Sequence, residues 1–219
     1  QPLSIVGTIN AYTALLAEHA GHHAIYCSGA GVANASYGMP DLGVTTLDNV
    51  LEDARRITQA SSLPLLVDID TGWEEQDGGI ANAIKSMIAA GVGAVHVEDQ
   101  VSAKRCGHRP NKQLVSLTAM QDRIKAASDG RTDDSFVIMA RTDALASEGM
   151  DSAIERATAY VEAGADMIFF EAATSIDDYA TFCAAVAVPV LANCTEFVKT
   201  QIIDRTQLAE AGVAMVLYP

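Results

Sequence analysis

The 219-residue sequence predicts an α/β fold of the TIM-like (β/α)₈ barrel type. Short, almost continuously apolar runs alternate with amphipathic helical patterns along the chain, which is typical of a parallel sheet covered by helices. Eight such runs are present, and eight favour a closed barrel over an open doubly wound sheet. The first run is not followed by the Gly-x-Gly-x-x-Gly fingerprint that would indicate a dinucleotide-binding fold.

The elements follow one another in a regular order. The predicted strands cover residues 4–10, 24–29, 63–70, 94–99, 136–143, 167–172, 189–196 and 213–219. Helical spacing of apolar residues separates them, most clearly over residues 47–60 and 150–165. Four helical stretches end in Ala-Gly shortly before a strand, at Gly21, Gly91, Gly164 and Gly212. A glycine there supplies the left-handed residue that closes a helix, so each pair predicts a helix-to-strand turn.

Chain length indicates one barrel domain over residues 1–219, because no linker or low-complexity segment divides it. A typical barrel has about 250 residues, whereas the predicted eighth strand is the last element of this chain. We therefore expect terminal helices of the complete barrel to be absent from the printed sequence. The chain also opens without a methionine, so a removed mitochondrial transit peptide is compatible with it.

The composition excludes several classes of partner. Asp and Glu number 28 against 14 Lys and Arg, a formal net charge of −14, which argues against nucleic acid or an anionic membrane surface. No apolar run approaches the ~20 residues of a membrane-spanning helix. The four cysteines show no Cys-x-x-Cys spacing, so we expect reduced thiols and a cytoplasmic location.

Carboxylates gather where the predicted strands end, which is the functional face of such barrels. Asp68 and Asp70 are two residues apart on the third strand and therefore face the same side, and Glu98 lies near the end of the fourth. Three carboxylates with room for water suit Mg²⁺, with Mn²⁺ as a substitute, whereas Zn²⁺ would need paired His or Cys ligands. His96, in the middle of the fourth strand, is expected to pack outside the barrel lumen.

Positive charge concentrates in the stretch KRCGHRPNK, residues 104–112, which follows the fourth strand. Neighbouring cations lower the pKa of a thiol, so Cys106 is suited to proton transfer near neutral pH. Opposite a metal, the side chains of Arg105, His108 or Arg141 would hold the carboxylates of a substrate. The sequence thus predicts a site for a small molecule with several carboxylates.

The same stretches resemble a known family. KRCGH, together with VDIDTG, HVEDQ and IMARTDA, resembles the isocitrate lyase/phosphoenolpyruvate mutase superfamily. The longer KRCGHRPNK, with GTINAY, MPDLG and NCTEF, is similar to its 2-methylisocitrate lyase branch. The resemblance implies a Mg²⁺-dependent carbon–carbon lyase that cleaves 2-methylisocitrate, a tricarboxylate, to pyruvate and succinate. It also implies a homotetramer that exchanges C-terminal helices, and a place in propionate catabolism by the methylcitrate cycle.

The resemblance also implies a role for each matching residue. Asp68 would ligate Mg²⁺, with Asp70 and Glu98 holding it through water. Cys106 would protonate the succinate carbanion, His108 and Arg141 would stabilise that fragment, and Tyr26 is the candidate base. The implied substrate contacts are Ser28, Gly29, Ala30, Asp41, Lys104, Arg105, Gly107, Glu171, Asn193 and Thr195.

One departure from the family and two other functions stay open. Residues 73–79, WEEQDGG, replace a glycine-rich run of the family and place three acids at the mouth of the predicted site. The first alternative is a lyase or hydrolase of the same superfamily that acts on isocitrate, oxaloacetate or a related dicarboxylate. The second is a non-catalytic barrel that binds carboxylates as a sensor or an assembly subunit.

Overall fold

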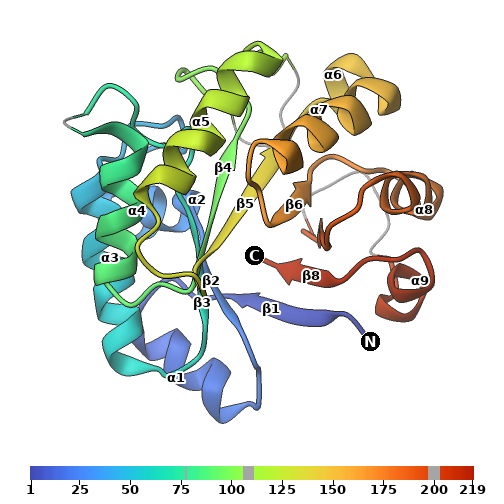
Figure 1. Cartoon of the computed structure of the whole chain (residues 1–219). Coiled ribbons are helices and arrows are strands. Elements are labelled where there is room, and N and C mark those ends of the chain that lie inside the picture. Colours follow the sequence, from blue (N-terminus) through green and yellow to red (C-terminus); the bar gives the residue numbers. More distant parts are fainter. Residues whose placement is uncertain (77, 106–110, 197–202) are drawn as a thin grey trace.

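The computed structural model, which describes residues 1–76, 78–105, 111–196 and 203–219, confirms the barrel (Figure 1). Eight parallel strands pair in sequence order, and β1 closes the ring by pairing with β8, Leu3 opposite Met215. The strands are β1 Leu3–Gly7, β2 Ile25–Cys27, β3 Leu65–Asp68, β4 Ala94–Glu98, β5 Val137–Thr142, β6 Met167–Phe170, β7 Val190–Asn193 and β8 Met215–Tyr218.

Helices cover the outside of this barrel. The helix predicted over 47–60 is confirmed at both ends, because Thr46 and Asn49 cap each other's backbone at its start. The helix predicted over 150–165 ends three residues earlier, at Glu162. The described helices are α1 Ala11–His19, α2 Gly29–Gly31, η1 Val32–Ser36, α3 Leu47–Ala60, α4 Gly79–Ala89, α5 Leu117–Gly130, α6 Leu145–Glu148, α7 Met150–Glu162, α8 Ile176–Ala185 and α9 Arg205–Glu210.

The four Ala-Gly links turn the chain from helix to strand as predicted. Each glycine has a positive φ: 84° at Gly21, 81° at Gly91, 115° at Gly164 and 90° at Gly212. Residues with a side chain rarely adopt this conformation. The links therefore fix where the corresponding helices end and the next strands begin.

All eight predicted strands exist, and all of them end earlier than predicted. The run predicted over 189–196, for example, leaves the sheet after Asn193. Residues just beyond these ends keep single backbone hydrogen bonds to the neighbouring strand before the chain enters the loops; Asp99 N, for example, donates to the carbonyl of Arg141 at 3.2 Å. The residues that matter for a site therefore lie at the last positions of the strands or directly after them, where loops from different strands meet.

The apolar residues form two separate layers. One fills the barrel lumen and includes Ile5, Leu66, Met139, Phe169 and Leu217. The other, larger layer lies between the strands and the helices. In the described part of the chain, no helix has the length and apolar character needed to cross a membrane.

Candidate active site

The carboxyl end of β3 holds two buried carboxylates against the turn after β2. Asp68 is the last residue of β3, and Asp70 follows with a left-handed φ of 48°. The backbone N–H groups of Gly29 and Asp70 donate to Asp68 at 3.1 and 3.0 Å. A Cβ atom on residue 29 would lie 2.9 Å from Asp68 Oδ2. Glycine is therefore needed at this predicted contact position, so that the backbone can approach the carboxylate.

Lys104 inserts its ammonium group among these acids. Its Nζ lies 2.5 Å from Asp41 Oδ1 and 2.6 Å from Asp70 Oδ1. Burial lowers the pKa of Lys104, but the carboxylates of Asp68 and Asp70 outweigh burial and raise that pKa above its ordinary value. Lys104 is therefore a constant cation that connects the Asp41 loop to the end of β3.

The two aspartates respond differently to these surroundings. Burial raises the pKa of Asp68, but neighbouring His96, Lys104 and Arg141 outweigh burial and lower it to about 2. Burial and the charge of Asp68 raise the pKa of Asp70 to about 6, in spite of Lys104. Asp68 is thus a carboxylate at any physiological pH, whereas Asp70 titrates just below neutrality.

Glu98, at the end of β4, completes the predicted metal set. Burial raises its pKa well above the ordinary value, and its buried Oε1 atom has no hydrogen-bond partner among the described residues. Three carboxylates with an unpartnered oxygen fit a hard cation such as Mg²⁺. Within the described ranges, no three His, Cys, Asp or Glu side chains already stand at metal-binding positions.

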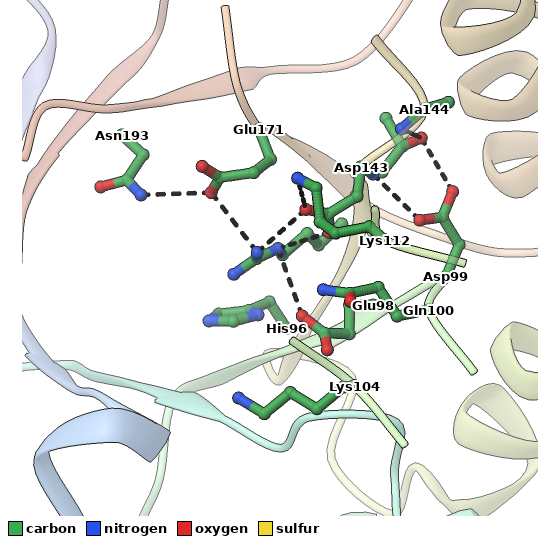
Figure 2. Close-up of polar contacts among 12 residues, drawn as sticks. His96, Glu98, Asp99, Gln100, Lys104, Lys112, Asp143, Ala144, Glu171 and Asn193 are labelled. Atoms are coloured by element: carbon green, nitrogen blue, oxygen red, sulfur yellow. Dashed lines mark hydrogen bonds and ion pairs between the residues drawn. The ribbon is translucent and has the colours of Figure 1, made fainter. Parts of the chain in front are cut away.

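Arg141, on β5, connects the ends of four strands. Its guanidinium donates to Asp143 from Nε at 2.9 Å and from Nη2 at 3.2 Å. Its Nε lies 3.4 Å from Glu98 Oε2, and its Nη2 lies 3.6 Å from Glu171 Oε2, which accepts from Asn193 at 3.2 Å. Figure 2 shows this network reaching from Glu98 to Asn193. The structure thus brings four residues predicted from separate strand ends into one cluster.

The prediction that His96 packs outside the barrel lumen is wrong. Its Nε2 lies 3.0 Å from Tyr26 Oη and 3.7 Å from Asp68 Oδ1, and its ring packs against Phe169 inside the barrel. Alternation along a strand puts residues two apart on the same face, so His96 shares the face of Glu98. Burial lowers the pKa of His96 to about 4, so its imidazole is neutral.

Tyr26, the candidate base, lies in the lumen beneath the aspartates. Burial and the charge of Asp68 raise its pKa well above the ordinary value. Tyr26 is therefore a phenol at neutral pH, not a phenolate. It can take up a proton only while it passes its own to a neighbour, and Nε2 of His96 is in hydrogen-bond reach.

The other predicted contact residues divide into three groups. Ser28 caps α2 by accepting from Gly31 N at 3.3 Å, Ala30 lies in that turn, and Thr195 is buried after β7. Arg105 has an exposed side chain, and its backbone exchanges two hydrogen bonds with the side chain of Gln100. Cys106, Gly107 and His108 lie outside the described residues.

The departure at residues 73–79 is partly compensated by α5. Glu74 accepts from Arg123 at 2.8 Å, and Trp73 donates to the carbonyl of Thr45 at 2.8 Å. Arg123 also donates to the carbonyls of Glu98 and Gln100, at 2.9 and 2.7 Å. One of the three acids is therefore neutralised by a cation that also supports the end of β4. Asp77 lies outside the described residues.

Sequence reasoning assigned no role to Asp99, the buried acid that directly follows Glu98. It accepts from Thr142 Oγ1 at 2.8 Å, from the backbone of Asp143 at 2.9 Å and from Tyr160 Oη at 2.9 Å. Asp99 thereby fixes the backbone that carries the Arg141–Asp143 pair. The adjacent pair Glu98-Asp99 was visible in the sequence, but the partner on α7 was not.

Comparison with known proteins gives consistent matches over the whole chain. The family described as phosphoenolpyruvate phosphomutase matches residues 1–219. The 2-methylisocitrate lyase of Shewanella oneidensis is 63% identical, over all of this chain and 75% of that protein. A crystal structure of 2,3-dimethylmalate lyase superposes with a TM-score of 0.94 at 33% identity, covering all of this chain and 74% of that one. A phosphonopyruvate hydrolase in complex with oxalate and Mg²⁺ has a TM-score of 0.84 at 31% identity, covering 99% of this chain and 75% of that one.

These matches confirm the resemblance inferred from the motifs and the carbon–carbon lyase class that it implied. They also agree with the geometry, since the strand-end acids and Arg141 meet at the face where such barrels carry their sites. The chain belongs to the isocitrate lyase/phosphoenolpyruvate mutase superfamily, and its sequence groups with the 2-methylisocitrate lyases.

Proposed function

We propose that this protein cleaves 2-methylisocitrate into pyruvate and succinate in a Mg²⁺-dependent reaction. The main support is the 3.4 Å contact between Glu98 Oε2 and Arg141 Nε, in a chain 63% identical to a curated 2-methylisocitrate lyase. This contact joins a carboxylate set suited to a cation with a buried guanidinium suited to a carboxylate. A substrate with a hydroxyl group and three carboxylates matches both halves.

Magnesium would be held directly by Asp68 and through water by Asp70 and Glu98. The unpartnered Glu98 Oε1 and the Mg²⁺ in the phosphonopyruvate hydrolase relative support this assignment. When bound, the metal would supply a Lewis acid next to the hydroxyl and carboxylate of the fragment that leaves as pyruvate. Mn²⁺, which accepts the same oxygen ligands, is the expected substitute.

The residues of the chain would bind the remaining carboxylates and move the protons. Arg141 would hold a carboxylate of the succinate fragment. Glu171, Asn193 and Thr195 would orient this fragment. The backbone of Gly29 and the side chain of Ser28 would flank the metal side. The side chain of Arg105 is exposed and would have to turn inward to reach the site. We therefore propose that Arg105 guides the substrate as it approaches.

Cleavage needs one proton removed and one proton added. Tyr26 would take the hydroxyl proton while its own passes to Nε2 of His96 at 3.0 Å, which requires the histidine tautomer protonated on Nδ1. The carbon–carbon bond then breaks, the new carbonyl forms on pyruvate, and the electron pair stays on the succinate fragment. Cys106 would give that carbon its proton, assisted by His108.

The substrate assignment is tested by measuring product release. Pyruvate formation from 2-methylisocitrate with Mg²⁺ is expected to exceed glyoxylate formation from isocitrate and pyruvate formation from 2,3-dimethylmalate. A pocket discriminates one methyl group by only about 10- to 200-fold, so slow cleavage of isocitrate is compatible with the proposal. Faster cleavage of another substrate would reassign it, and binding without any cleavage would favour the non-catalytic carboxylate-binding barrel.

Two further properties are proposed with the activity. The relatives extend beyond this chain, which spans 75% of the Shewanella protein, and a homotetramer is the proposed assembly. A cytoplasmic location is proposed because the described cysteines, Cys27, Cys183 and Cys194, are free thiols. Sedimentation of the full-length protein and fractionation of cells would test these two points.

A further inference from the structure

Lys112 is a buried cation whose use the sequence does not reveal. Only 2% of its side chain is exposed, and its Nζ lies 2.5 Å from Asp143 Oδ1, an atom of a fully buried side chain. Lysine is seldom buried to this degree without a charge partner, because its ammonium loses its hydration. The position of Lys112 therefore depends on Asp143, and Figure 2 shows the two side chains in contact.

Asp143 is shared between Lys112 and Arg141. Its Oδ1 receives both the ammonium of Lys112 and Nη2 of Arg141, and its Oδ2 receives Nε of Arg141. Its backbone N–H is held by Asp99 at 2.9 Å. A bidentate pair of this kind fixes the plane of a guanidinium. It uses one edge of Arg141, through Nε and Nη2, and leaves Nη1 outside the pair.

The charges around Arg141 explain why a second cation is useful. Glu98 belongs to the proposed metal set, so the carboxylates left to Arg141 are those of Asp143 and Glu171, at 2.9 and 3.6 Å. Among the described residues, one guanidinium thus faces two carboxylates, an excess of negative charge that would repel an anionic substrate. Lys112 balances the cluster, and in a buried site one charge at this range changes the local potential strongly.

We infer that Lys112 is a positioning residue for substrate binding: it neutralises Asp143, so that Arg141, oriented by the same carboxylate, keeps its charge available for a substrate carboxylate. The inference rests on the proposed function and deepens it by adding a residue that does not itself need to touch the substrate. Lys104, the first residue of the stretch 104–112, is the counterpart of Lys112, because its ammonium contacts Asp41 and Asp70.

The test compares Lys112→Met with a control, Lys125→Met, which removes a largely exposed lysine from α5. Succinate binding is measured by calorimetry with Mg²⁺ present, and KM and kcat are measured for 2-methylisocitrate. Lys112→Met is expected to weaken succinate binding and to raise KM by on the order of 10- to 100-fold. The kcat value is expected to fall much less, and the control is expected to match the wild type.

A double variant separates the charge role from a merely structural one. Lys112→Met removes the ammonium that offsets the buried carboxylate of Asp143, so the site gains one net negative charge. Lys112→Met/Asp143→Asn removes both charges and leaves the net charge of the site unchanged. The double variant is therefore expected to bind succinate more tightly than Lys112→Met, a non-additive result. If Lys112→Met fails to fold, the double variant is compared directly with the wild type and is expected to bind within about 10-fold of it.

The outcomes distinguish the inference from the proposed function. Wild-type cleavage with Lys112→Met indistinguishable from Lys125→Met would overturn the inference alone. A double variant that binds no better than Lys112→Met, or more than about 10-fold worse than the wild type, would overturn it as well. Wild-type protein that neither cleaves 2-methylisocitrate nor binds succinate would overturn the proposed function and the inference with it.

Discussion

The β3–β4 side and the β5–β7 side of the barrel mouth are built from equivalent strand-end positions, yet they carry opposite chemistry. On the first side, Asp68, Asp70 and Glu98 outnumber the one ammonium that lies near them in the described part of the chain, that of Lys104. On the second, Arg141 and Lys112 balance Asp143 and Glu171. The first side therefore suits a divalent cation and the second an anion. The Glu98–Arg141 contact places the two within reach of one small molecule.

The comparison teaches that an acidic protein need not repel an acidic substrate. The net charge of −14 acts over the whole surface, but buried pairs set the potential where the substrate would bind. The described cations Lys104, Lys112 and Arg141 each contact at least one carboxylate of the protein. Predictions that remove one side while sparing the other test whether the two sides act separately.

Removing the anion side should have the largest effect. Arg141→Met is expected to lower kcat/KM for pyruvate release by about 10³-fold, because a charge-assisted contact to the substrate disappears from a buried site. Mg²⁺ affinity, measured by calorimetry, is expected to change by less than about 10-fold. Arg55→Met, at an exposed position on α3, is the matched control. Equal losses of metal and substrate binding would contradict two separable sides.

Removing the cation side should have the converse effect. Asp68→Asn is expected to weaken Mg²⁺ binding by about 100-fold or more, since it replaces the only proposed direct ligand. The readout is the rise in Tm caused by added Mg²⁺, which should nearly vanish in the variant. Asp70→Asn, at a water-bridged position, should weaken binding by only about 10-fold. A larger effect at Asp70 would exchange the two assignments.

The pH dependence of metal binding should show a smaller effect. Because burial and Asp68 raise the pKa of Asp70 to about 6, protons compete with Mg²⁺ for this carboxylate below pH 6. Mg²⁺ affinity is therefore expected to increase from pH 5 to 7 and to level off above. In the metal-free protein, the same raised pKa affects folding in the opposite direction. Protonated Asp70 contributes most to the free energy of unfolding below about pH 4, and this contribution is lost as the pH rises from about 4 to 6. Calorimetry on Asp70→Asn should show a flatter affinity profile, and an unchanged profile would remove Asp70 from this role.

The smallest effect is expected where the sequence departs from its family. Glu74→Gln removes the ion pair with Arg123, in which Glu74 is 40% exposed, so stability should change by less than about 1 kcal/mol. If the acid is neutralised as the structure indicates, KM should change by less than about 2-fold. A KM that falls several-fold would instead mean that Glu74 repels the substrate.

The sequence carried most of the architecture. Apolar runs and Ala-Gly links gave the eight strands, and the helical spacing of apolar residues gave both ends of α3, because each of these signals is local. The strand-end position of Asp68, Glu98, Arg141 and Glu171 followed from the same pattern. His96 was misplaced although its two-residue spacing from Glu98 was visible, so that error lay in the interpretation.

By itself, the sequence determined the parallel barrel and the family, since both depend on the order and spacing of residues along the chain. Only the tertiary structure decided which charges meet. The pairs Lys104–Asp41, Lys112–Asp143 and Arg123–Glu74 join residues 63, 31 and 49 positions apart. No local pattern encodes such pairs, because they arise when the sheet closes and brings loops from distant strands to one end. Burial, which shifts the pKa of Asp70 and keeps His96 neutral, is likewise a property of that closed arrangement.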